Sequence, residues 1–201
     1  MIGALGPVLA TLGVGSIAVA PALQPSLSNF FAGLHLLVDR PLVPGDYITL
    51  DSGEEGTVVH VGWRSTKIRK LQNNMVIVPN DKLAGSVITN YFQPDRPMSL
   101  LIPVSVSYDC DARHVEDVLI RVASASTKDI EGLLAEPEPF VRFIPGFGES
   151  SLDFTLIVRV REFVDQYLVQ HELRHRILES FRKENIEIPY PQRTLHMRPE
   201  P

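Results

Sequence analysis

The distribution of charge along this chain constrains its fold more than any other feature. All 19 basic and 24 acidic residues of the 201-residue sequence lie after Val38. Residues 2–23 also lack Asn, Gln and His. As an α-helix rising about 1.5 Å per residue, that uncharged run would extend about 33 Å, close to the thickness of a bilayer's hydrocarbon core. The sequence therefore predicts a membrane α-helix within residues 1–38, followed by a soluble part.

The uncharged run is unusually dense in small residues, which suits contact with other helices. Small side chains let helix backbones approach closely in lipid, where no hydrophobic force drives helices together. We therefore expect the run to pack against copies of itself. The predicted packing positions are Gly13, Gly15, Ala18, Ala20 and Ala22.

Two prolines, Pro21 and Pro25, interrupt this run. Proline removes a backbone donor and clashes with the preceding turn, so we expect a break near Pro25 and a second helix over residues 26–37. A cleaved signal peptide is disfavoured because no basic residue precedes the apolar run. A buried pair of soluble helices is disfavoured by the length of the uncharged segment.

The soluble part divides into two patterns of secondary structure. Short β-type runs at residues 47–50, 56–61, 65–71, 75–78 and 86–91 are separated by turn residues and predict a small SH3-like or Sm-like barrel over 39–93. The order strand, helix, strand, strand, helix then predicts a ferredoxin-like α+β domain over 94–190. Within 191–201, a last strand over 194–198 has no evident partner, so we expect it to pair with other chains as an oligomerisation strand.

Composition excludes several classes of protein. A net charge of −5 disfavours a nucleic-acid partner, and the single Cys110 excludes a disulfide scaffold. The run His171-Glu172-Leu173-Arg174-His175 matches a zinc-protease motif, which leaves a zinc-dependent hydrolase as a remote alternative. Both histidines are expected on the solvated helix face, and the sequence supplies no convincing third ligand. We predict no catalytic residues, no metal and no cofactor.

A series of motifs resembles the small-conductance mechanosensitive channels, in that family's order and spacing over essentially the whole chain. The motifs are Ala22-Leu23-Gln24-Pro25-Ser26-Leu27-Ser28-Asn29, Ala32-Gly33, Arg40-Pro41, Pro44-Gly45-Asp46, Gly56-Thr57-Val58, Val78-Pro79-Asn80 and Ile188-Pro189-Tyr190-Pro191-Gln192. The resemblance implies a homoheptamer in the cell inner membrane, with the first helix lining the pore. It also implies cytoplasmic C-terminal domains that form a vestibule, and a small barrel of C-terminal strands.

The resemblance also assigns positions within the pore helix. The two apolar constrictions fall on Ile17 and Pro21, and the hinge falls on Gln24 and Pro25. Pro21 stands where the family usually has a larger aliphatic residue, and Pro25 replaces a small flexible one. The family has at least two membrane helices before this one, so we expect a longer, multi-pass full-length protein.

Two functions therefore remain. The favoured one is an osmotic safety valve that passes ions and small osmolytes through the lipid bilayer when membrane tension rises. The alternative is a non-conducting, membrane-anchored oligomeric scaffold.

Overall fold

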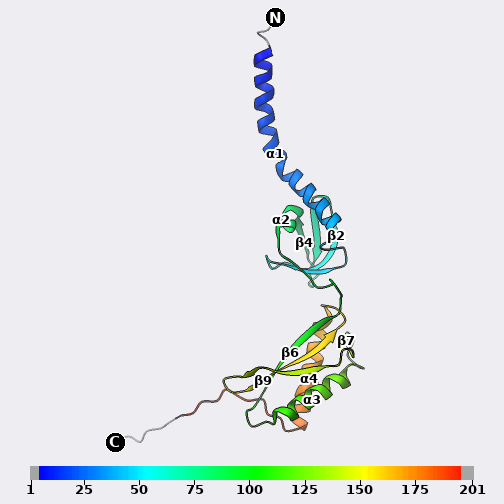
Figure 1. Ribbon diagram of the computed structural model, residues 1–201, viewed down its shortest axis with the longest axis vertical. Coiled ribbons are helices and arrows are strands. Elements are labelled where there is room, and N and C mark those ends of the chain that lie inside the picture. The colour runs from blue at the N-terminus through cyan, green and yellow to red at the C-terminus, as the bar shows by residue number, and fades with distance from the viewer. Residues whose placement is uncertain (1–4, 196–201) are drawn as a thin grey trace, which may run out of the picture. The chain divides into compact units, whose positions relative to one another are not determined.

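The computed structural model describes the backbone of residues 5–195 and the side chains of residues 21–195. The chain forms two compact units that divide between Gln93 and Pro94. The first holds a long helix and a β domain, and the second is an α+β domain (Figure 1).

The first unit begins with the helix α1 (Leu5–Asp39), which contains both Pro21 and Pro25. We predicted two helices separated by a break, whereas the structure has one continuous helix that changes direction part-way along (Figure 1). Each proline removes a single hydrogen-bond donor, so it bends a long helix whose other backbone bonds remain.

Membrane crossing is a separate matter from helix length. Within the described part of the chain, no helix combines the length and the apolar character that a bilayer span requires. The membrane span predicted within residues 1–38 stays a prediction.

The β domain is an antiparallel five-stranded sheet in the order β4-β3-β2-β1-β5. Its strands are β1 (Tyr47–Leu50), β2 (Glu55–Val61), β3 (Ser65–Arg69), β4 (Met75–Pro79) and β5 (Ile88–Asn90). A short helix, α2 (Asn80–Gly85), connects the last two strands and was not predicted. Alternate side chains of β3 face inward, where Ile68 is fully buried with Ile48, Val58 and Leu83. The five strands were predicted with boundaries differing by up to two residues.

The second unit packs two helices on an antiparallel sheet. The central strand β9 (Leu152–Val160) pairs with β6 (Met98–Val106), β8 (Phe140–Phe147) and the two-residue β7 (Leu133–Leu134). Helices α3 (Ala112–Ser126) and α4 (Asp165–Lys183) lie together against one face (Figure 1). The strict alternation of buried side chains along β9 supplies the centre of this core, as the period of two in a strand requires.

This unit confirms the predicted α+β class, and only β7 was missed because two residues carry no periodic signal. The predicted last strand over 194–198 is not tested. Residues 194 and 195 have no regular secondary structure, and the remaining three positions lie outside the described residues.

Candidate functional site: the junction between α1 and the β domain

One face of α1 is buried against the β domain, and its residues follow helical spacing. Asn29, Gly33 and Leu36 are buried, whereas most of their neighbours along the helix are exposed. The spacing of four and three residues places these side chains on one side of the helix. Figure 1 shows this half of α1 next to α2, which it contacts. The uncharged helix is therefore attached to the β domain through a narrow stripe.

Asn29 makes the polar link between α1 and α2. Its Oδ1 accepts a hydrogen bond from the backbone N–H of Asp81 at 3.1 Å, and its Nδ2 donates to the carbonyl of Pro25 at 2.8 Å. The N-cap residue of α2, Pro79, makes no side-chain capping hydrogen bond. Asn29 therefore satisfies one of the free N–H groups in the first turn of α2, while it also holds the carbonyl of a proline in its own helix.

Gly33 is a point of close approach between α1 and the β domain. A Cβ added there would lie 2.6 Å from Nδ2 of Asn80 and 2.8 Å from the carbonyl oxygen of Trp63, both shorter than ordinary contact. Only a residue without a side chain lets α1 approach the turn between β2 and β3 this closely.

The contact is rigid because Asn80 is itself fixed. Asn80 and Thr66 are fully buried, and the Thr66 hydroxyl donates to Oδ1 of Asn80 at 2.9 Å. Nδ2 of Asn80 donates to the carbonyl of Gly62 at 2.9 Å, and its backbone N–H donates to Arg64 at 3.0 Å. A buried polar group that lost these partners would pay its full desolvation cost, so the network holds α2 in one position under α1.

The segment that follows α1 is fastened to the sheet by Asp46. Its Oδ2 accepts from the backbone N–H of Val43 at 2.9 Å and from Nδ2 of Asn90 at 2.7 Å. Nδ2 of Asn90 also donates to the carbonyl of Pro41 at 3.1 Å. The connection between helix and sheet is therefore held in place at both of its ends.

A second face of α1, about 110° around the helix from the docked one at 100° per residue, is apolar and open. Five of its side chains, spaced three or four residues apart, are each about half exposed: Leu23, Leu27, Phe30, Leu34 and Leu37. We call these five residues the outer stripe. A helix with one docked face and one exposed apolar face needs a second apolar environment, such as lipid or another helix.

The predicted pore residues fall in two groups. Pro21, Ala22, Gln24 and Pro25 lie in α1 and are exposed, and Pro21 and Gln24 line a shallow hollow with Leu27 and Ser28. The side chains of Gly13, Gly15, Ile17, Ala18 and Ala20 lie outside the described residues, so their roles stay predictions. The junction contacts of Asn29 and Asn80 were not predicted. The sequence offered one weak signal for each residue. Asn29 is a polar amide within a mostly apolar stretch, and Asn80 is a polar amide directly after a predicted strand.

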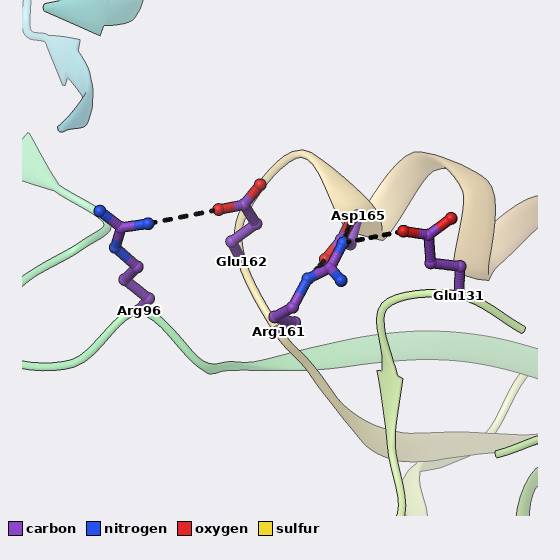
Figure 2. A network of polar contacts seen from close by, with 5 residues as sticks. All are labelled: Arg96, Glu131, Arg161, Glu162 and Asp165. Carbon is purple, nitrogen blue, oxygen red and sulfur yellow. Dashed lines mark hydrogen bonds and ion pairs between the residues drawn. The ribbon is translucent and has the colours of Figure 1, made fainter. Parts of the chain in front are cut away.

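The second unit contains a polar cluster that fixes the start of α4. The Arg161 guanidinium binds both carboxylate oxygens of Asp165, at 3.0 and 3.2 Å, and Glu131 at 3.4 Å (Figure 2). The hydrogen bonding that Arg161 donates to the Asp165 carboxylate is the main reason that the pKa of Arg161 is raised. Figure 2 also shows Arg96 paired with Glu162 at 3.9 Å. All of these contacts join segments within the second unit, so we assign the cluster a structural role.

The zinc-protease motif does not assemble a catalytic site among the described residues. His171 and His175 lie on an exposed face of α4 with ring centroids 4.6 Å apart. The described part of the chain contains no group of three or more His, Cys, Asp or Glu side chains placed to hold a metal ion. A catalytic zinc usually has three protein ligands.

Comparisons with known proteins cover most of the chain. Residues 25–93 match the family profile described as the mechanosensitive ion channel β-domain, and residues 100–188 match that of the mechanosensitive ion channel MscS, C-terminal. The large-conductance mechanosensitive channel MscMJLR of Methanocaldococcus jannaschii is 33% identical over 94% of this chain and 53% of its own length. The small-conductance mechanosensitive channel of Edwardsiella ictaluri is 35% identical over 90% of this chain and 60% of its own.

Among solved structures, the closed-state crystal structure of Helicobacter pylori MscS superposes with a TM-score of 0.83 at 27% identity. The match covers 98% of this chain and 75% of that one. The chain thus spans about half the length of the first curated relatives that it matches. These similarities point to a channel rather than an enzyme.

Proposed function

The chain belongs to the small-conductance mechanosensitive channel family, and on that premise we propose that it forms one subunit of a homo-oligomeric channel that opens when membrane tension rises. The whole assembly would pass ions and small osmolytes and act as an osmotic safety valve. The observation that carries this proposal is that α1 has one face docked on the β domain and another apolar face exposed. The docked face connects the helix mechanically to a folded β domain.

The junction explains how movement of the helix reaches the β domain. Asn29 and Gly33 hold α1 against α2 and the turn between β2 and β3. The polar network behind this contact includes Asn80 and Thr66, which are both fully buried. If the part of α1 before the prolines moves, either α1 must bend at Pro21 or Pro25, or the contacts of the junction must be strained. The bend near Pro25 is the softer of the two, so we assign the hinge to Gln24 and Pro25.

The outer stripe and the small residues fit an assembly of several copies in a bilayer. We infer that Gly13, Gly15, Ala18, Ala20 and Ala22 let α1 helices pack around a central axis, and that the outer stripe faces lipid or a neighbouring copy. A heptamer in the inner membrane, with Sm-like β domains and the C-terminal domains in the cytoplasm, follows from the family resemblance. The last strand over 194–198 would pair between copies.

Gating in such an assembly is an equilibrium between two states. Ile17, together with Pro21, would form an apolar ring that resists wetting when narrow and conducts when widened. To change the population of the open state from 1% to 99%, tension must supply about 5.5 kcal/mol of differential free energy. That energy would reach the ring through the membrane part of the full-length protein.

Substitution of Ile17 in the full-length protein tests the proposal. We expect Ile17→Ser to make the ring easier to wet, so that patch recordings show openings at lower tension and cells leak ions. Ile17→Val, which keeps the ring apolar, is the matched control and should leave the threshold near that of the wild type. If pressure evokes no current from the reconstituted wild type, and Ile17→Ser changes neither ion flux nor osmotic survival, the protein is instead a non-conducting scaffold.

A further inference from the structure

A pair of histidines on α4 is used by neither the fold nor the proposed channel. His171 and His175 are four residues apart, exposed, and their ring centroids lie 4.6 Å apart with the ring planes at 69°. Other residues of this helix, including Leu173 and Ile177, pack into the core of the second unit. The two imidazoles therefore project from a helix that is held in place independently of them.

The spacing and chemistry of the pair suit a metal ion. Residues at i and i+4 lie above one another on a helix face, which lets two imidazole nitrogens reach one ion. Neutral imidazole is a preferred ligand of Zn²⁺, Cu²⁺ and Ni²⁺, whereas Mg²⁺ and Ca²⁺ prefer oxygen ligands. The pair thus selects by ligand type among the divalent cations.

The surroundings leave room for an ion and its water. The histidines line an open hollow with Tyr167, Gln170 and Arg174. At about 100° per residue, Arg174 lies on one flank of the pair and Glu172 on the other, and the exposed Glu179 lies one turn beyond His175 on nearly the same face. A dication at the pair therefore has one basic and two acidic side chains around it, which favours cation binding.

We propose that His171 and His175 form a surface binding site for a divalent transition-metal ion, held by two imidazole nitrogens, with water in the remaining positions. The described residues offer no third protein ligand at the pair, so the site binds and does not catalyse. Binding closes one turn of α4 as a chelate and stabilises that helix. The order of affinity follows ligand preference, with Cu²⁺ above Ni²⁺ and Zn²⁺.

The test uses the full chain, purified without a polyhistidine tag and titrated with CuCl₂ or ZnCl₂, with MgCl₂ as the control salt. We expect one Cu²⁺ per chain, an electron paramagnetic resonance spectrum with nitrogen ligands, and a rise in melting temperature with ZnCl₂ that EDTA reverses. Because a metal ligand contributes at least as much as its supporting partners do, His175→Ala should weaken Cu²⁺ binding about 10- to 100-fold. Circular dichroism of the variants confirms that α4 remains folded, as its exposed position predicts.

A respaced variant separates chelation from the mere presence of histidines. His175→Ala combined with Glu179→His keeps two histidines on the same helix but separates them by eight residues, about 12 Å along the axis. It should bind as weakly as His175→Ala alone. His60→Ala, which removes an exposed histidine from β2, should leave the affinity unchanged. Equal affinity of the respaced variant and the wild type, equal weakening by His60→Ala, or no Cu²⁺ binding at all would each overturn the proposal.

Discussion

Replacing Gly33 by alanine perturbs the junction at a point where α1 closely approaches the β domain. The new Cβ would lie 2.6 Å from Nδ2 of Asn80 and 2.8 Å from the carbonyl oxygen of Trp63. The carbonyl belongs to the backbone and cannot rotate away. The Asn80 amide can move only by giving up its hydrogen bond to Gly62.

The magnitude follows from three opposing effects. Alanine is favoured over glycine in a helix by about 1 kcal/mol. Overpacking a tight site costs about 1–3 kcal/mol, and a buried amide left without its partner costs about 1–3 kcal/mol more. We therefore expect Gly33→Ala to destabilise the first unit by about 1–5 kcal/mol despite its better helix propensity.

Trp63 provides a direct assay because it is the single tryptophan of the chain and lies in the turn that Gly33 contacts. Urea unfolding in detergent, followed by tryptophan fluorescence, reports on the junction itself. With a denaturant slope of about 2 kcal/mol per molar, the expected loss lowers the midpoint by about 0.5–2.5 M urea.

Gly85→Ala is the matched control, because Gly85 also lies in a helix and a Cβ there meets nothing within 4 Å. It should leave the midpoint unchanged or raise it slightly. The reasoning fails if Gly33→Ala is as stable as the wild type, or if the two alanine variants are destabilised equally.

Three further predictions concern other parts of the chain. The hydrogen bond from the Ser52 hydroxyl is the main cause that lowers the pKa of Glu54, so Ser52→Ala should raise that pKa in an NMR titration. The stability that this carboxylate provides is present above its pKa in the unfolded chain, and is lost as the pH falls through its pKa in the folded protein. Gly132→Ala should lower the melting temperature of the second unit, because φ is +85° and a Cβ would lie 2.5 Å from the Asp165 carboxyl carbon. Ile68→Ala, at a fully buried position, should cost about 2–5 kcal/mol in urea unfolding of the first unit.

The sequence predicted the classes of structure well where a regular pattern extended over several residues. The alternation along β9 and the apolar stripe of α4 each extend over enough residues to distinguish a strand from a helix. The two-residue β7 and the six-residue α2 were missed because each is shorter than the stretch of sequence over which its periodicity can be recognised. We also did not predict that α1 continues through two prolines. The prediction considered only the hydrogen bond that each proline removes, and not the helical hydrogen bonds that remain on either side of it.

The candidate site shows a different division. The motif containing Asn29 and Gly33 indicated the family, but gave no indication that Asn29 caps α2 or that Gly33 lies against Trp63. Those contacts join residues up to 52 positions apart, and no local pattern encodes such a pairing.

The sequence alone determined that the chain has an uncharged start, a β domain followed by an α+β domain, and the motifs of a channel family, because charge, periodicity and short motifs are properties of neighbouring residues. Only the tertiary structure decided which face of α1 is docked and which face, the outer stripe, is left open. That choice depends on the fit of a glycine and two buried amides against a folded sheet, and such a fit exists only once distant segments have been brought together.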